Sequence, residues 1–384
     1  MSSPADRKLK GALLMSVEEK RLTEAVKSVQ EQVNKTVLGK EEEIREITAA
    51  FLANGHVLLE DIPGVGKTTM AVAFSRAMQL EYKRIQFTPD VLPSDLTGFS
   101  VYRREKEQFV YQPGSVFCNL LLADEINRTS PKTQSALLEV MEERRVTVDG
   151  VTREVPSPFI VIATQNPAGA AGTQRLPEAQ VDRFTVSLSL GYPDYESELL
   201  MAKGIGPEDK YAKLQPVMTG ELLLEIQRRI HDVYMKDSIY EYLLKLVRGT
   251  RSHPYIERGA SPRATIALVR MAKASAWMDG RDYVIPRDAA EQFPYVVSHR
   301  IILTGAARAE RKTKNDILRE IADKIEAPPM GEERGRWSMR ISHFCSLCFM
   351  SPECMRARRL WCCSWYSFSL YRPCLRLPFI SKGI

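Results

Sequence analysis

The chain has 384 residues, of which 44% are hydrophobic and 27% are charged, a composition typical of a globular protein of two or three domains. No apolar run approaches the ~20 residues that a membrane-spanning helix needs. The N-terminal segment also lacks the sustained apolar stretch of a signal peptide. We therefore expect a cytoplasmic protein with no membrane span.

Charge is distributed unevenly along the chain. The 54 Lys and Arg against 48 Asp and Glu give a net charge of +6. Residues 331–384 hold nine basic and three acidic residues, so the 330 residues before them balance at 45 against 45. Because nucleic-acid binding depends on clustered basic residues, we expect no nucleic-acid partner for this neutral body. Only one of the seven cysteines, Cys118, lies in the body, which fits a reducing compartment.

Two helices are expected before the first strand. Ser16-Val17-Glu18-Glu19 has the pattern of a capping box and predicts a helix that starts there and runs to about residue 32. A second helix is expected from about residue 41 to residue 53, ended by Asn54-Gly55. The turn between them, Val37-Leu38-Gly39, either connects the helices or forms a wall of a base pocket.

The stretch from His56 to Met70, HVLLEDIPGVGKTTM, has the layout of a phosphate-binding loop between a strand and a helix. Glycines let successive backbone N–H groups surround a phosphate, while the lysine reaches the β- and γ-phosphates and the threonine hydroxyl binds magnesium. The full pattern asks for glycine at position 61, where this chain has Asp61. The rest is intact, and the residues predicted to bind phosphate are Pro63, Gly64, Val65, Gly66, Lys67, Thr68 and Thr69.

Strands and helices alternate through the first half of the chain. Short apolar strands separated by helices indicate a parallel sheet covered on both faces, with the ligand site beyond the carboxyl ends of the strands. A helix is expected at about residues 68–78, and further strands are expected at about residues 84–87, 119–123, 159–164 and 184–189.

Two hairpins interrupt this alternation. Aromatic-bearing extended pieces at residues 99–103 and 108–111 flank a charged turn, and residues 145–155 alternate β-branched and polar side chains about Asp149-Gly150. From residue 192 to about residue 325 strand patterns largely vanish. Because Ser261-Pro262 is a good helix start and Gly280 a good helix end, we predict a second, helical domain there.

Two acids end the buried strand LLLADE. At the carboxyl end of a strand beside the phosphate loop, Asp124 can hold magnesium and Glu125 can polarise an attacking water. A solvated acidic pair before a loop is the alternative. The phosphate loop upstream favours the catalytic interpretation.

Three more polar residues are candidates for the reaction. Asn166, after the strand in FIVIATQNP, can contact the γ-phosphate or orient the water, or it can simply cap a turn. Arg183 and Arg263 can neutralise charge on the γ-phosphoryl group, either within the chain or from a neighbouring subunit. Each arginine also fits an ordinary surface ion pair.

These motifs together resemble one protein family. GVGKT, LLLADEINR, ATQNP, LPEAQVDRF and GASPRA, in this order and spacing over about residues 16–327, are similar to the MoxR family of AAA+ ATPases, in the clade with an insert in the second helix. The resemblance implies an α/β AAA+ P-loop domain of three layers with a parallel five-stranded sheet at residues 1–191. An all-α lid domain at residues 192–330 would follow.

The resemblance also implies roles for the candidate residues. Gly64, Gly66, Lys67 and Thr68 would form Walker A, and Asp124 with Glu125 would form Walker B. Asn166 would be sensor 1, Arg183 the arginine finger acting on a neighbour, and Arg263 sensor 2, with Val37 and Gly39 near the adenine.

The family resemblance implies a ring-forming, often hexameric, ATP- and Mg2+-dependent ATPase that remodels or matures partner proteins. Proteins with von Willebrand factor A domains are common partners in the family. Two other functions stay open from the sequence: a DNA-dependent motor, which the neutral body disfavours, and a nucleotide-switched scaffold with negligible turnover, which Asp124-Glu125 disfavours.

The tail from Gly331 departs from the family pattern. It holds eight Arg, six Cys and three of the four Trp. A zinc site at His343, Cys345, Cys348 and Cys354 lacks the usual second ligand pair, and an anchor at residues 360–371 is too short to span a bilayer. We favour a third interpretation, in which the tail is not an evolved domain and arises from out-of-frame or read-through translation.

Overall fold

The computed structural model describes residues 4–61, 64–165, 176–203, 211 and 213–329. Nearly all of them belong to one compact unit, Met1–Pro328. The predicted zinc and anchor residues, together with Pro63 and Asn166, lie outside the described residues.

A parallel five-stranded sheet forms the centre of the unit, as predicted. Its strand order is β2-β5-β8-β1-β9, and every neighbouring pair is parallel. The strands are β1 (Val57–Glu60), β2 (Tyr82–Gln86), β5 (Leu120–Asp124), β8 (Ile160–Gln165) and β9 (Val186–Leu188). Since β5 lies between β2 and β8, the residues that end these three strands meet at one edge of the sheet.

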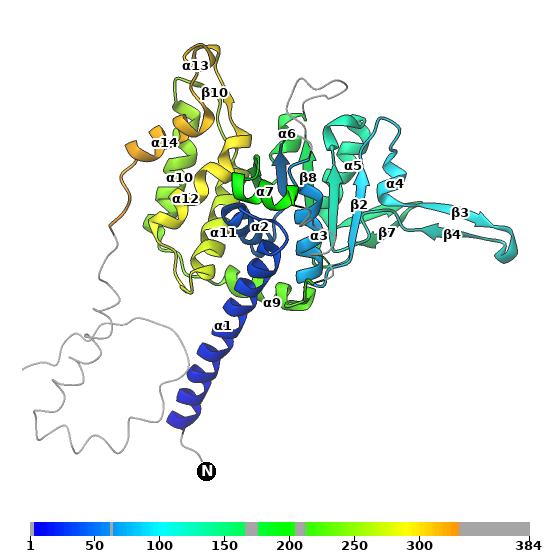
Figure 1. Cartoon of the computed structure of the whole chain (residues 1–384), viewed down its shortest axis with the longest axis horizontal. Coiled ribbons are helices and arrows are strands. Elements are labelled where there is room, and N and C mark those ends of the chain that lie inside the picture. Colours follow the sequence, from blue (N-terminus) through cyan, green and yellow to red (C-terminus); the bar gives the residue numbers. More distant parts are fainter. Residues whose placement is uncertain (1–3, 62–63, 166–175, 204–210, 212, 330–384) are drawn as a thin grey trace, which may run out of the picture. The chain divides into compact units, whose positions relative to one another are not determined.

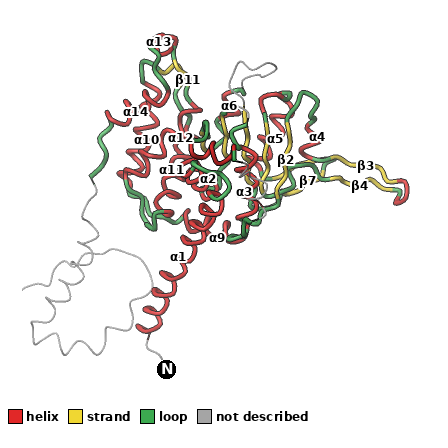
Figure 2. Tube along the Cα trace, viewed as in Figure 1, coloured by secondary structure: helices red, strands yellow, loops and turns green. Residues whose placement is uncertain are grey.

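Helices cover both faces of the sheet, which makes the predicted three layers (Figures 1 and 2). Alternate strand residues point to opposite faces, so Leu59 joins a core with the first three helices while Leu58 joins a second core with the helix after β5. These helices are α1 (Pro4–Asn34), α2 (Glu41–Leu52), α3 (Lys67–Ala77) and α5 (Pro131–Glu143), with the short α4 (Pro93–Thr97) and α6 (Glu178–Val181) beside them.

The predicted start of the first helix is wrong. Helix α1 begins at Pro4 and continues through Ser16 without a break. Proline suits the first turn of a helix, and the Leu-, Lys- and Ala-containing residues that follow favour helix, so the Ser16 pattern is not needed as a start signal.

Both predicted hairpins are present. Strands β3 (Phe99–Arg103) and β4 (Gln108–Gln112) form an antiparallel pair that extends away from the sheet (Figure 1). Strands β6 (Arg145–Val148) and β7 (Val151–Glu154) are joined by Asp149 and Gly150, both of which have positive φ angles as a two-residue hairpin turn requires.

Helices dominate the second half of the unit. Ser261 caps α11 through its hydroxyl, and Gly280 follows the end of that helix with φ +76°. The helices are α7 (Tyr195–Ala202), α9 (Gly220–His231), α10 (Asp237–Ser252), α11 (Pro262–Met278), α12 (Pro286–Val297), α13 (Gly305–Ala309) and α14 (Lys314–Lys324), and a two-stranded sheet pairs β10 (Ile256–Arg258) with β11 (Ile302–Leu303). Buried apolar residues of the helices from α9 to α14 share a core with α1, α2 and α3.

Candidate active site

The phosphate loop connects β1 to α3. Gly64 and Gly66 have φ angles of +91° and +90°, a backbone conformation that glycine adopts without strain. Space is open where a Cβ atom would stand at either position, so a ligand can approach the backbone. Lys67 is the first residue of α3, and its neighbours Thr68 and Thr69 lie in the first helical turn. The N-terminus of α3 therefore directs its free N–H groups toward the loop, as phosphate binding requires.

Lys67 is held at the base of the loop. Its Nζ donates a hydrogen bond to the main-chain oxygen of Asp61 at 2.9 Å, and the side chain is buried. Burial lowers the pKa of Lys67, while the carboxylates of Asp61, Asp124 and Glu125 oppose that shift. A buried ammonium group near three carboxylates is suited to exchange these partners for phosphate oxygens.

Asp61 replaces the expected glycine and has a structural role. Its buried carboxylate accepts hydrogen bonds from the Ser189 hydroxyl at 2.7 Å and from the backbone N–H groups of Leu190 and Gly191 at 2.5 and 3.2 Å. Glycine has no side chain to make these bonds. Asp61 therefore fastens the phosphate loop to the segment after β9.

The two acids lie at the end of β5, as predicted. Asp124 is buried, and its Oδ1 accepts a hydrogen bond from the Thr164 hydroxyl of β8 at 2.6 Å. The same hydroxyl oxygen accepts a hydrogen bond from the Glu125 N–H at 2.9 Å. Glu125 has φ +55°, a left-handed conformation uncommon for a residue with a side chain. Thr164 therefore fixes the turn at which the chain passes from one acid to the next.

Two arginines contact the acids. Arg84 of β2 donates from Nη2 to Asp124 Oδ2 at 2.7 Å and to Gln86 Oε1 at 3.1 Å. Arg128 pairs with Glu125 through Nη1 and Oε2, also at 2.7 Å. Both carboxylates are thus ion-paired in this structure.

A pocket of about 390 Å³ brings these groups together. It opens over the loop and over the ends of β2 and β5, and its described lining residues are Gly64, Gly66, Lys67, Thr68, Thr69, Arg84, Gln86, Asp124 and Glu125. The structure therefore brings five of the predicted phosphate-binding residues together with the two acids. Val65 is not among the described lining residues, and Pro63 lies outside the described residues.

The turn predicted near the adenine packs against the segment that precedes α7. Val37 is buried, and a Cβ added at Gly39 would stand 2.3 Å from Asp194 Oδ2, just before α7. Lys40 donates to the Tyr192 main-chain oxygen at 3.1 Å. Among the described residues, Val37 and Gly39 do not line the phosphate-loop pocket, and their contact with a base remains a prediction.

Arg183 and Arg263 share one partner outside this pocket. Arg183 Nε lies 3.4 Å from Glu142 Oε2, and Arg263 Nη2 donates to Glu142 Oε1 at 2.6 Å. Neither arginine is among the described residues that line the phosphate-loop pocket of its own chain. The surface ion pairs considered from the sequence are thus present, and both involve the same carboxylate.

Comparison with known proteins places the chain in a family. Residues 56–186 match the model of an ATPase family associated with various cellular activities (AAA), and residues 248–321 match that of an AAA lid domain. Chaperone MoxR1 of Mycobacterium tuberculosis is 39% identical over 306 residues, which cover 77% of this chain and 81% of that protein. The chain belongs to the MoxR family of AAA+ ATPases.

Two further proteins are similar to this MoxR-family chain over most of its length. The uncharacterized protein YeaC of Bacillus subtilis is 47% identical over 298 residues, which cover 78% of this chain and 93% of that protein. The crystal structure of a proposed ATPase from Cytophaga hutchinsonii superposes with a TM-score of 0.77 at 39% identity, covering 84% of this chain and 99% of that one. The predicted AAA+ fold with its lid is confirmed.

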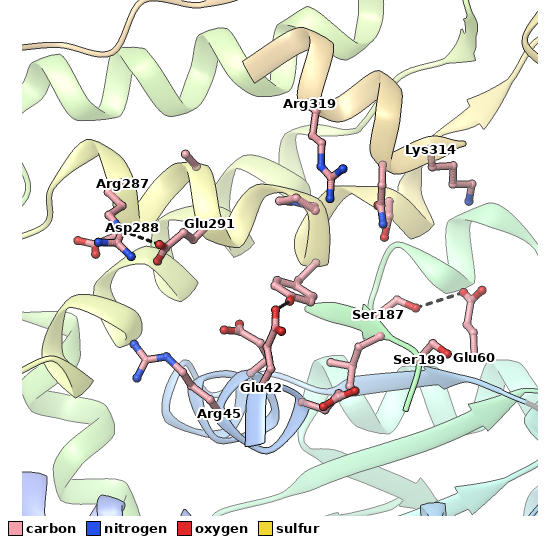
Figure 3. Close-up of a pocket in the computed structure, with 18 of the residues that line it drawn as sticks. Glu42, Arg45, Glu60, Ser187, Ser189, Arg287, Asp288, Glu291, Lys314 and Arg319 are labelled. Atoms are coloured by element: carbon pink, nitrogen blue, oxygen red, sulfur yellow. Dashed lines mark hydrogen bonds and ion pairs between the residues drawn. The ribbon is translucent and has the colours of Figure 1, made fainter. Parts of the chain in front are cut away.

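A second pocket of this MoxR-family protein lies away from the phosphate loop. It has a volume of about 1330 Å³ and lies between α2, β9, α12 and α14. Figure 3 shows Glu42 and Arg45 of α2 on one side of it and Lys314 and Arg319 of α14 on another. Its described lining residues include none from the phosphate loop, so size alone does not identify the reaction site.

Arg84, Arg128, Thr164 and Glu142 were not predicted as site residues. Arg128 follows Glu125 by three residues in ADEINR, so a local signal existed for it. The other three act across strands or between elements, and nothing in their immediate sequence marks their partners.

A search of the described helices for a membrane span found none with the required length and apolar character.

Proposed function

We propose that this protein hydrolyses ATP in an Mg2+-dependent reaction and uses the energy to remodel a partner protein. The observation that carries the proposal is the pocket in which Lys67 and Thr68 of the phosphate loop face Asp124 and Glu125. A phosphate-binding loop and two acids in this arrangement are the parts that nucleotide hydrolysis needs.

The donor atoms in the pocket fit magnesium. The Thr68 hydroxyl and the Asp124 carboxylate supply hard oxygen donors, which Mg2+ prefers. Each Asp124 oxygen already accepts one hydrogen bond, from Thr164 or Arg84, and a carboxylate has about four lone-pair sites, so acceptor capacity remains for a water of a hydrated ion. When bound, Mg2+ would neutralise charge on the β- and γ-phosphates.

The residues of the chain then divide the reaction between them. Loop N–H groups and Lys67 bind the phosphates, and the Glu125 carboxylate takes a proton from the attacking water. The water oxygen forms a bond to the γ-phosphorus while the bond to the bridging oxygen breaks, leaving ADP and phosphate. For this step the Glu125 carboxylate must exchange its contact with Arg128 for the water.

We propose a ring-shaped homo-oligomer, with a hexamer favoured, in which Arg183 acts on the nucleotide of the neighbouring subunit. Arg183 is partly exposed and is not among the described lining residues of its own pocket, which supports this arrangement. By family likeness the clients would be proteins, including those with von Willebrand factor A domains.

We place the protein in the cytoplasm because its body holds a single cysteine, as is typical of a reducing compartment. We also retain the division of the body into two domains at residue 191.

Steady-state ATPase assays on three variants test this proposal. Lys67→Ala should lose nucleotide binding, Glu125→Gln should bind ATP but hydrolyse it at least about 100-fold more slowly, and Arg183→Ala should slow hydrolysis only in the assembled protein. A monomer in the presence of ATP, or an Arg183→Ala variant as fast as wild type, would refute the shared site. Several-fold stimulation by DNA at physiological salt would instead support the motor function. A pull-down with Glu125→Gln in ATP should retain the client.

A further inference from the structure

Glu142 is the common partner of the two arginines to which the family resemblance gives separate roles. It lies in the last turn of α5, whereas Arg183 follows α6 and Arg263 lies in the first turn of α11. One oxygen of its carboxylate faces each guanidinium, at 3.4 Å from Arg183 Nε and 2.6 Å from Arg263 Nη2. Three elements distant in sequence thus converge on one side chain.

The backbones that carry the arginines are also joined. Asp182, next to Arg183, accepts hydrogen bonds from the Ser261 hydroxyl at 2.8 and 3.0 Å, and Ser261 is the N-cap of the helix that carries Arg263. The Arg300 guanidinium contacts the same Asp182 carboxylate at 2.8 Å and also donates to the Phe184 main-chain oxygen at 2.6 Å. Because the Arg300 side chain is only 3% exposed, this support is part of the protein interior.

The arginines themselves remain accessible. The side chains of Arg183 and Arg263 are 30% and 47% exposed, and that of Glu142 is 42% exposed. Exposed ion pairs contribute only ~0–1 kcal/mol to stability, so stability does not account for this arrangement. Two guanidinium groups repel each other, however, and a carboxylate between them lets both stay on one small patch of surface.

We propose that Glu142 is a positioning residue that presents Arg183 and Arg263 as one pair to the nucleotide of a neighbouring copy of the chain. This inference rests on the proposed function, in which Arg183 acts between subunits. It adds that Arg263 serves the same neighbouring site and that the carboxylate of Glu142 sets the spacing of the pair. Loss of Glu142 should therefore reduce turnover in the neighbour and leave the nucleotide pocket of its own chain intact.

A mixing experiment on the full-length chain tests this directly. Glu142→Ala should lower kcat at least about tenfold, because misplaced catalytic groups lose most of their effect, while ATP binding and thermal stability stay close to wild type. Glu125→Gln subunits hydrolyse ATP at least about 100-fold more slowly than wild type but carry an intact arginine pair. When Glu125→Gln subunits are mixed with Glu142→Ala subunits, the rate per Glu142→Ala subunit should rise. The competent pocket of a Glu142→Ala subunit then receives the intact arginine pair of its Glu125→Gln neighbour.

Two variants serve as controls. Glu143→Gln removes the adjacent carboxylate, which pairs with Arg145 at 3.0 Å, and should keep the wild-type rate. Glu142→Gln keeps one carbonyl oxygen as an acceptor and should fall between wild type and Glu142→Ala. If Glu142→Ala were poorly folded, Glu142→Gln would carry the same mixing test.

The outcomes separate this inference from the proposed function. If Arg183→Ala hydrolyses ATP at the wild-type rate, the shared site itself is refuted. If Arg183→Ala is slow but Glu142→Ala and Glu142→Gln are not, only the positioning role fails. If Glu142→Ala hydrolysed ATP faster than wild type, the carboxylate would be keeping the arginines away from the neighbouring nucleotide. If Glu142→Ala were slow and mixing with Glu125→Gln subunits did not raise its rate, Glu142 would be acting within its own chain. Either result would overturn the inference.

A double-mutant comparison provides an independent readout. In the Arg183→Ala/Arg263→Ala background, adding Glu142→Ala should change kcat by less than about twofold, because the groups that Glu142 positions are already absent. A full further loss in that background would contradict the proposed pathway from Glu142 through the arginines.

Discussion

The Thr164 hydroxyl donates a hydrogen bond to the Asp124 carboxylate at 2.6 Å. This bond links β8, the strand before the predicted sensor 1 residue, to the acid proposed to hold magnesium. Thr164 is fully buried, and its oxygen also accepts from the Glu125 N–H. The two acids at the end of β5 are thus held by one side chain of β8.

Replacing Thr164 by valine should slow hydrolysis. Valine keeps the shape but removes both hydrogen bonds, the one to the Asp124 carboxylate and the one from the Glu125 N–H, so the turn at Glu125 loses this support. We expect kcat to fall at least about tenfold and the free energy of unfolding to fall by about 1–3 kcal/mol. Steady-state ATPase assays and chemical denaturation measure the two effects. Thr164→Ser keeps the hydroxyl and should retain most of the activity, so a serine variant as slow as valine would show that the methyl group matters instead.

Restoring the glycine of the general phosphate-loop pattern should weaken this protein. Asp61→Gly removes the three hydrogen bonds to residues 189–191 and adds backbone freedom, and should lower the free energy of unfolding by about 2–4 kcal/mol. We expect no tighter ATP binding. Thermal melting and titration with a fluorescent nucleotide analogue check both statements, with Asp61→Asn as the milder variant. Unchanged stability in Asp61→Gly would contradict the fastening role.

Glu46, on the wall of the larger pocket, should make stability depend on pH. Burial raises its pKa from the ordinary value of 4.5 to about 7, against the opposing effects of the Gln292 hydrogen bond and the Arg45 charge. The folded state therefore binds a proton more tightly than the unfolded state, so stability falls as pH rises between about 4.5 and 7. The full effect is about 3 kcal/mol.

Glu46→Gln should remove this pH dependence. The variant should melt at a higher temperature than wild type at pH 8, where the buried carboxyl is ionised only in wild type, and close to wild type at pH 5. The exposed Glu41 provides a control, since Glu41→Gln should shift the melting temperature equally at both pH values. Equal melting temperatures for Glu46→Gln and wild type at pH 8 would argue against ionisation of a buried Glu46.

A chain that ends at Met330 should keep full activity. The sequence change at Gly331 favours a tail that is not an evolved domain, and the described site residues all lie before it. ATPase rate and oligomeric state in the presence of ATP are the measurements. A clear loss of either would show that the tail takes part in function.

Much of the fold follows from local pattern, whereas side-chain partnerships do not. The strands of the central sheet, both hairpins and the α11 boundaries were predictable because alternation, Asp149-Gly150 and Ser261-Pro262 are short-range signals. The short pair of β10 and β11 was not predicted, since the lid was expected to be all-α. The start of α1 was not, since a capping pattern at Ser16 is equally compatible with a helix interior. The phosphate loop is contiguous in sequence, but the role of Asp61 depends on residues about 130 positions later, which no local pattern reveals. The pairing of Arg183 and Arg263 through Glu142 similarly required the structure.

The anchoring of Asp182 has a consequence for communication around an assembly. Because Asp182 is held by Ser261 at the start of α11 and by the buried Arg300, the segment with Arg183 cannot move far unless the helical region moves with it. In the proposed ring, a γ-phosphate that attracts Arg183 from an adjacent subunit would therefore also displace the helices joined to Asp182. Loss of the γ-phosphate on hydrolysis would release Arg183 and let these helices move back. Each turnover in one subunit would therefore change the position of the helices in the neighbour that supplies Arg183.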